Sequence, residues 1–151
     1  MTRRLRLIGI GCGHPDQLTV EAVEALRASS FALVTVKRGA GVEGDDPLAA
    51  ARRAIIERHA PGLRVVEVLD PERDRCAAAT ATTSGYEGVV KDWHDARAEA
   101  WEVALQAGWV GTAGDASGDI ALLVWGDPAF YDSTIRVVER IVARGELELE
   151  W

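Results

Sequence analysis

The sequence predicts a three-layer α/β/α fold built around a mostly parallel, five-stranded sheet. Short apolar, β-rich runs alternate along the chain with segments whose apolar residues recur at helical spacing. The 151 residues suit one domain, and 48% hydrophobic and 27% charged residues lie close to the globular average. Strands separated by helices predict right-handed crossovers, parallel pairing and helices on both faces of the sheet.

The N-terminal part of the chain predicts a strand, a helix and a second strand. Residues 4–10 form a short apolar run closed by glycines, which is typical of a buried parallel strand. Apolar residues at helical spacing follow, with Asp16 or Thr19 as the candidate N-cap of this first helix. Residues 31–36 are rich in β-formers and predict the second strand.

A second helix and a third strand follow. Asp46 and Pro47 predict an N-cap and a first helical residue, and the Pro-Gly pair at 61–62 predicts the end of that helix. Residues 63–69 predict the third strand. The polar segment 70–85 predicts a loop.

The C-terminal part predicts a long helix, a linker and a central strand. Residues 86–105 have apolar positions at helical spacing, and Trp93 and Trp101 on that stripe are predicted to serve the core or a domain interface. His94 is predicted to lie off the stripe. Residues 108–118 predict a flexible linker, and residues 120–125 lack polar side chains, which predicts a central strand.

A last helix and strand complete the predicted fold. Residues 130–143 have inward-facing aliphatic positions at helical spacing, and Gly145 stands where a left-handed C-terminal cap is expected. Residues 147–151 alternate as a fifth strand.

Charge and cysteine content argue against several classes of protein. A net charge of −7 disfavours nucleic acid as a partner. Cys12 and Cys76 lie far apart and outside any metal-ligand spacing, which predicts neither a disulfide framework nor a metal site. No apolar run reaches the roughly 20 residues of a membrane helix, and a cytoplasmic protein with no membrane partner is expected.

Two glycine loops are the candidate ligand-binding segments, because ligands of parallel sheets bind beyond the carboxyl ends of the strands. The loop after the first strand has glycines at 9, 11 and 13 but His14 where the dinucleotide fingerprint needs a further glycine. The second predicted strand is followed by Lys37 and Arg38 and not by the acidic residue that holds a ribose. Both features disfavour an NAD-binding domain, and the basic pair leaves an NADP-binding domain only as a minor alternative. The second loop follows Trp125, and its Asp127 is either a site residue or part of a helix start.

Residues 9–26 (GIGCGHPDQLTVEAVEAL) and 125–133 (WGDPAFYDS) resemble the two signatures of the tetrapyrrole methylases, in the expected order. Segments 70–75, 93–98 and 126–141 are similar to a member that couples methylation to loss of acetate. The resemblance implies an S-adenosylmethionine-dependent C-methyltransferase of corrin synthesis. It also implies two α/β domains with the cofactor between them, so residues 1–151 correspond to the N-terminal domain only.

The resemblance also implies the site residues. The cofactor contacts fall on Cys12, Trp125, Gly126, Asp127 and Phe130, with Cys12 in place of the family's usual proline. The substrate would be a precorrin, a polycarboxylate that requires basic residues, and the candidates are Lys37, Arg38, Arg73 and Arg75, with the first two preferred. The resemblance identifies no catalytic residue and implies a homodimer for the full-length protein. A non-catalytic binding or association module of the same fold is the alternative from a different class.

Overall fold

The computed structural model describes residues 3–37, 46–71, 83–110, 118–127, 132–145 and 147–150. Its strands are β1 (Arg3–Gly9), β2 (Ser29–Lys37), β3 (Arg64–Asp70), β4 (Asp119–Val124) and β5 (Leu147–Glu150). Its helices are the short 3-10 helix η1 (Pro15–Gln17), α1 (Val20–Arg27), α2 (Pro47–His59), α4 (Thr83–Val110) and α5 (Asp132–Arg144).

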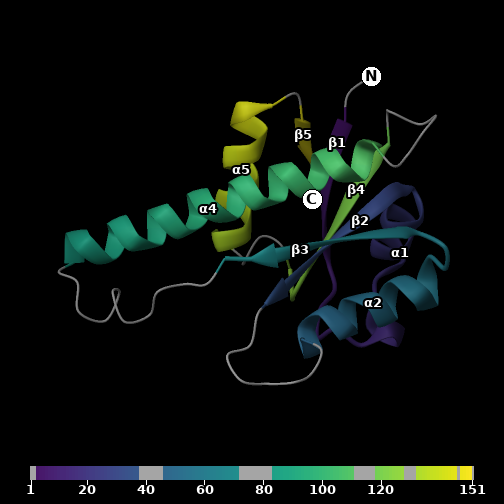
Figure 1. Ribbon diagram of the computed structural model, residues 1–151. Coiled ribbons are helices and arrows are strands. Elements are labelled where there is room, and N and C mark those ends of the chain that lie inside the picture. Colours follow the sequence, from purple (N-terminus) through teal and green to yellow (C-terminus); the bar gives the residue numbers. More distant parts are fainter. Residues whose placement is uncertain are drawn as a thin grey trace.

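The strands lie in the order β3-β2-β4-β1-β5 and all pair in parallel (Figure 1). The predicted α/β architecture with a parallel sheet is confirmed. Four strands, each at least six residues long, form the body of the sheet. The short β5 adds four paired residues at the β1 edge, so it extends this four-stranded body only slightly and is not the full fifth strand that the sequence predicts.

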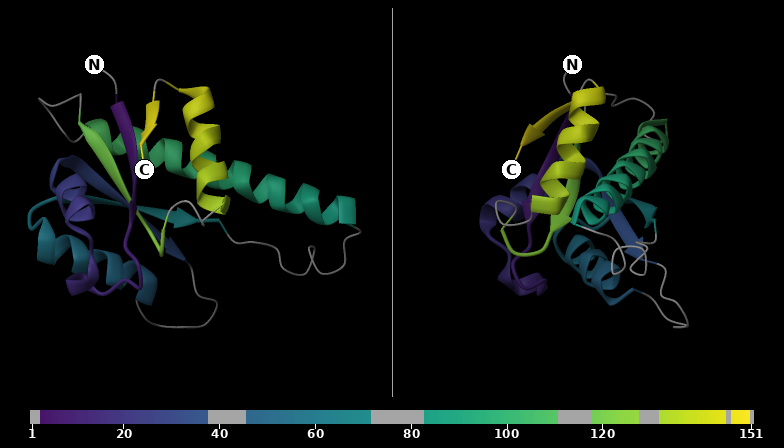
Figure 2. Two further views of the ribbon diagram at one scale, coloured as in Figure 1. Left: turned by 180° about the vertical axis from the view of Figure 1, so that it is seen from behind. Right: turned by 90° about the vertical axis from the view of Figure 1, so that its left-hand side faces the viewer.

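Helices cover both faces of the sheet, which gives the three layers seen in Figure 2. One core packs α4 and α5 against the sheet around Phe31 and Trp101, and the other packs α1 and α2 against the opposite face around Ile10 and Leu26. Strand β4 lies between β2 and β1, and its last five residues are all buried. The predicted central strand is therefore confirmed, and its end, which leads into Trp125, lies in the middle of the carboxyl edge of the sheet.

Helix capping follows the local sequence signals at two helices. The Thr19 hydroxyl accepts a hydrogen bond from the backbone N–H of Ala22, so Thr19 and not Asp16 is the N-cap of α1. The Asp46 carboxylate accepts from the backbone N–H of Leu48 at 3.0 Å and caps α2, with Pro47 as the first helical residue. These short-range predictions are confirmed because the side chain and the N–H that it binds are close in sequence.

Helix α4 differs most from the sequence prediction. It begins at Thr83, inside the segment predicted as a loop, and continues to Val110, inside the predicted linker. Gly108 is buried, and a Cβ there would lie 2.5 Å from ring atoms of Phe31 on β2. The helix continues because this glycine permits a close approach to the sheet. The local sequence does not show this contact, so it predicts a linker here. Residues 111–117 lie outside the described part of the chain.

Two smaller predictions are wrong. Gly145 has no left-handed backbone, since the glycines with positive φ among the described residues are Gly11, Gly13, Gly62 and Gly126. His94 is 5% exposed and not on a solvent face, because the adjoining turns of α4 are also covered.

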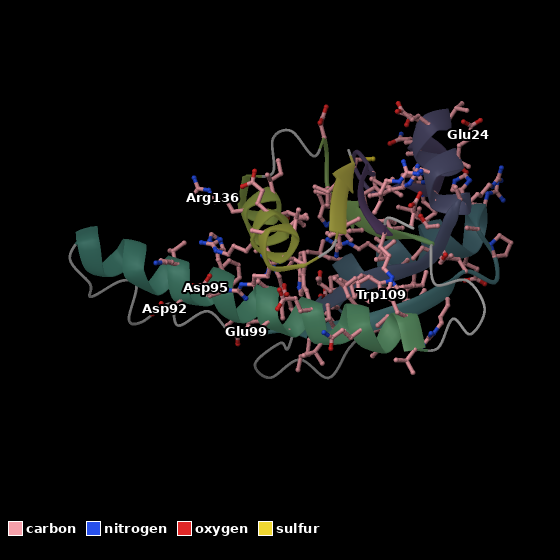
Figure 3. The ribbon with its side chains drawn as sticks, turned by 90° about the horizontal axis from the view of Figure 1, so that it is seen from above. Glu24, Asp92, Asp95, Glu99, Trp109 and Arg136 are labelled. Carbon is pink, nitrogen blue, oxygen red and sulfur yellow. The ribbon has the colours of Figure 1, made fainter. Side chains whose placement is uncertain are left out.

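Helices α4 and α5 are linked by ion pairs outside the core. Arg140 Nε lies 2.9 Å from Asp95 Oδ1, and Arg144 Nη1 lies 3.7 Å from Glu102 Oε2. Figure 3 shows Asp92, Asp95 and Glu99 along α4, the long helix that extends beyond the sheet. None of the helices that the structure describes is both long and apolar enough to cross a membrane.

Candidate functional site

The structure joins the two glycine loops at the carboxyl ends of β1 and β4. The Gly11 N–H donates to the Gly126 carbonyl at 3.3 Å, and the Gly126 N–H donates to the Gly11 carbonyl at 2.8 Å. Both residues have positive φ, +56° and +65°, a conformation that side chains disfavour. The two loops therefore form one structural unit, as expected of loops that follow neighbouring parallel strands.

Trp125 fixes the shape of this unit by packing against Gly13. A Cβ on Gly13 would lie 2.0 Å from Cζ3 of the Trp125 ring, so only a glycine permits this contact. The Trp125 indole N–H is buried and has no hydrogen-bond acceptor in the described part of the structure. Cys12 between the glycines is exposed, and its thiol lies 2.6 Å from Gln17 Oε1.

A groove of about 790 Å³ extends from the joined loops along β1 and α1. Its glycine end is formed by Gly9, Gly11, Gly126 and Asp127, and its wall on α1 includes Glu21 and Glu24. Figure 3 shows Glu24 on α1. The size matches that of a small-molecule or cofactor pocket.

The groove is acidic. Asp127, Glu21 and Glu24 line it, whereas its one described cation, Arg6, is ion-paired with Asp119 at 2.6 Å. Such a lining favours a cationic ligand and disfavours one that carries several phosphates.

The predicted site residues divide into three groups. Cys12, Trp125, Gly126 and Asp127 lie together in the joined loops, and Asp127 is exposed. The Lys37 side chain is exposed at the end of β2, and its backbone N–H donates to Asp46 Oδ2 at 3.0 Å. The others lie outside the described residues: Phe130, Arg38, Arg73 and Arg75.

A polar cluster that the sequence did not reveal lies at the carboxyl ends of β2, β3 and β4. Arg97 Nε donates to Asp70 Oδ1 at 3.2 Å, and the Trp101 indole N–H lies 3.3 Å from the same oxygen. Asp70 ends β3 and is buried, although the sequence placed it in a loop. The reason is that the buried arginine on α4 satisfies its charge, a pairing across 27 residues of sequence.

Arg52 on α2 completes this cluster. Its Nε donates to the Leu123 carbonyl at 3.1 Å, and its guanidinium lies 5.6 Å from the centre of the Trp125 ring. Burial lowers the pKa of Arg52, and the charge of Arg97 lowers it further, whereas Asp46 and Asp70 raise it. Its position in the second predicted helix, beside the ordinary surface residue Arg53, gave no sign of this role.

The three histidines play structural parts. The His14 Nδ1 accepts from the Asp16 N–H at 3.1 Å and caps η1, and the His59 ring at the end of α2 lies 2.5 Å from the Pro15 carbonyl. His94 contacts the Trp93 ring. No group of metal-ligating side chains occurs among the described residues.

Comparison with known proteins identifies the family. The family model of the Tetrapyrrole (Corrin/Porphyrin) Methylases matches residues 4–150. The chain belongs to the tetrapyrrole methylases. A precorrin-6A synthase [deacetylating] from Sinorhizobium sp is 40% identical over 96% of this methylase chain and 51% of its own length.

Solved structures agree with this family and fold. A Corynebacterium diphtheriae protein described as cobalamin-synthesis-related (CobF) is 29% identical, with a TM-score of 0.64 over 99% of this chain and 52% of its own. A conserved hypothetical protein from Aeropyrum pernix, 18% identical with a TM-score of 0.51, covers 100% of this chain with 38% of its own and shows the fold alone. This methylase chain thus spans about half the length of the relatives that it matches.

Proposed function

We propose that this chain is the N-terminal, cofactor-binding domain of an S-adenosylmethionine-dependent C-methyltransferase of corrin synthesis. The reaction proposed is that of the Sinorhizobium relative's name, formation of precorrin-6A. A methyl group would pass from S-adenosylmethionine to a ring carbon of precorrin-5, and one water would hydrolyse the acetyl group, which leaves as acetate. The observation that carries the proposal is the pair of glycine loops, joined by reciprocal backbone hydrogen bonds at the end of an acidic groove.

The residues of the joined loops fit S-adenosylmethionine. Gly11 and Gly126 present backbone without side chains, and the groove of about 790 Å³ has room for a nucleoside with an amino-acid arm. When bound, S-adenosylmethionine supplies an electrophilic methyl group on a positively charged sulfur. The carboxylates of Asp127, Glu21 and Glu24 favour that charge.

The protein's part in the methyl-transfer step is to position the reactants and to keep water away from the sulfonium methyl group. Gly126 and Asp127 would hold the cofactor from the β4 side, and Cys12 would hold it from the β1 side. Trp125 would act as the support of the loop, because its ring packs beneath Gly13. The proposal also includes Phe130 as a cofactor contact and Lys37 and Arg38 as substrate contacts. It further includes a precorrin as the substrate and a homodimer of the full-length protein.

The same acidic groove argues against an NADP-binding domain. The pyrophosphate and 2′-phosphate of NADP would meet three carboxylates, and Arg6, the cation among the described lining residues, is already paired with Asp119. A non-catalytic module of the same fold predicts no preference for the charged cofactor over its neutral analogue, which the experiment below measures.

Calorimetric titration of the 151-residue chain tests the proposal. We expect S-adenosylhomocysteine to bind and NADPH to give no heat of binding, because the groove is acidic. Binding of NADPH without S-adenosylhomocysteine would contradict the proposal. Absence of S-adenosylhomocysteine binding would refute a cofactor half-site formed by these loops.

Asp127→Asn adds a charge-specific readout. One exposed carboxylate near a sulfonium, at a dielectric close to that of water, is worth on the order of 1 kcal/mol, so S-adenosylmethionine affinity should fall about fivefold while that of the neutral S-adenosylhomocysteine changes little. Glu99→Gln on α4 (Figure 3) is the control, since Glu99 is exposed and is not among the residues that line the groove. Equal losses for both ligands in the Asp127 variant would contradict this role of the charge.

A further inference from the structure

A small cavity at the carboxyl ends of β2 and β4 shares no lining residue with the acidic groove. It measures about 50 Å³ and is lined at its polar positions by Arg52, Arg97, Thr35 and Thr134. The rings of Trp101 and Trp125 form part of its wall. Two guanidinium groups therefore converge on one small space beside a loop of the proposed cofactor site.

Arg97 is held rigidly at this cavity. It is 8% exposed, its Nε is bonded to Asp70, and its guanidinium lies 4.7 Å from the Trp93 ring centre and 4.9 Å from that of Trp101. These contacts use Nε and the faces of the guanidinium plane. In the described structure its terminal N–H groups, Nη1 and Nη2, donate to no acceptor.

Arg52 approaches the same cavity from α2, and its terminal N–H groups resemble those of Arg97 in their hydrogen bonding. Its Nε is bonded to the Leu123 carbonyl, and its plane lies over Trp125. Among the described residues no hydrogen-bond acceptor meets its Nη atoms. An arginine fixed at Nε and free at both terminal nitrogens retains the planar fork that binds a carboxylate through two hydrogen bonds.

Among the described residues, the charges at the cavity do not balance. Two guanidiniums face one buried carboxylate, Asp70. Asp46 is the second described carboxylate that acts on Arg52, and it already accepts from the backbone N–H groups of Lys37 and Leu48. Buried charge is costly unless it is paired, and burial has the largest effect on Arg52, whose pKa it lowers. Asp46 and Asp70 offset part of this effect, and the like charge of Arg97 lowers the pKa again. An anion in the cavity would relieve both effects.

We propose that Arg52 and Arg97 form a binding subsite for one carboxylate group of a ligand. The volume of about 50 Å³ suits a single carboxylate and is too small for an aromatic ring. Thr35 and Thr134 supply hydroxyl groups at the same cavity. The identity of the ligand rests on the proposed function, which offers two sources: a side arm of the tetrapyrrole or the amino-acid end of the cofactor.

The direct test is NMR of the arginine Nε–Hε groups in the 151-residue chain during titration with sodium propionate, with sodium chloride at equal ionic strength as the control. We expect the Arg52 and Arg97 signals to shift saturably with propionate only. Arg52→Gln should weaken propionate binding at least about tenfold, and Arg52→Lys, which keeps the charge without the fork, should weaken it as well.

Arg53→Gln is the matched control. Arg53 is the next residue of α2 and pairs with Glu67 on β3, so its loss should leave propionate binding unchanged. Equal responses of the parent chain to propionate and chloride would overturn the subsite, and this readout needs no variant to fold. Equal propionate affinity in the parent and in a folded Arg52 variant would overturn it too.

Competition assigns the source of the carboxylate. Displacement of propionate by S-adenosylhomocysteine but not by 5′-methylthioadenosine, which lacks the carboxylate, assigns the subsite to the cofactor. Displacement by a porphyrin octacarboxylate, with S-adenosylhomocysteine and propionate bound together, assigns it to the tetrapyrrole. Propionate binding without S-adenosylhomocysteine binding would refute the proposed cofactor and leave the subsite standing, whereas the reverse result would refute the subsite alone.

Discussion

Single glycines determine how closely the backbone and the aromatic rings approach at the candidate site. Gly13 has φ +87° and faces the Trp125 ring with no room for a methyl group. Gly62, after α2, has the same φ but no atom within 4 Å of a built Cβ. A comparison of Gly13 with Gly62 therefore separates the cost of backbone strain, which both positions have, from the cost of steric overlap, which only Gly13 has.

We predict that Gly13→Ala costs more stability than Gly62→Ala. Both variants carry backbone strain of about 1 to 2 kcal/mol, and displacement of the Trp125 ring adds about 1 to 3 kcal/mol in the first only. Urea unfolding of the two variants measures the difference. Equal destabilisation would mean that Trp125 moves aside freely and does not fix the loop.

Buried charge is the second feature at the scale of residues. Asp70 accepts hydrogen bonds from Arg97 and Trp101 in the core. The segment that begins at residue 70 was predicted as a loop, and this prediction is wrong for Asp70, which ends β3 and is buried. A buried aspartate is compatible with a strand end only when a distant cation is present, and local sequence does not report that cation.

Among the elements, α4 shows how one helix meets two environments. Gly88 lies in its N-terminal part, where a built Cβ meets nothing within 4 Å, and Gly108 lies in its last turn against Phe31 at 2.5 Å. A glycine inside a helix costs about 0.5 to 1 kcal/mol relative to alanine when nothing else changes.

We predict opposite signs for alanine at these two positions. Gly88→Ala should stabilise the chain by about 0.5 to 1 kcal/mol, because alanine loses less backbone entropy. Gly108→Ala should destabilise it by about 1 to 3 kcal/mol, because the methyl group overlaps Phe31. Thermal unfolding monitored by circular dichroism measures both. A stabilising Gly108→Ala would show that α4 does not pack closely on β2 in solution.

Elements also differ in how far sequence predicts their limits. The start of α2 is set by Asp46 and Pro47, two residues in contact with the first turn, and it was predicted correctly. The end of α4 is set by packing against a strand more than 70 residues earlier in the chain, and it was predicted as a linker. Signals that lie within a few residues of a helix end can be read from the sequence, whereas contacts across the core cannot.

In the whole molecule, stability is concentrated at the centre of the sheet. β4 pairs on both sides and is covered by helices on both faces, whereas β5 pairs on one side over four residues. Backbone amides of a central strand exchange only through large unfolding events, and those of a short edge strand exchange through local opening.

We predict that hydrogen exchange follows this order. Amides of β4 and of the paired part of β1 should exchange slowest, and those of β5 should exchange at least about tenfold faster, since local opening avoids about 1.4 kcal/mol or more of the global free energy. Hydrogen-exchange NMR at neutral pH measures the rates, with β2 as a second central strand. Protection of β5 equal to that of β4 would mean that the edge is as stable as the centre of the sheet.

The sequence by itself determined the alternation of helices and strands, the parallel sheet, the central position of β4 and the family, because periodicity and motif residues are local properties. It also placed the glycine loops at strand ends, where parallel pairing brings them together. Only the tertiary structure decided that Gly11 and Gly126 bond to each other, that α4 continues through Gly108, and that Arg52 and Arg97 share a cavity. These features depend on distances between residues remote in the chain, which packing of the folded core sets.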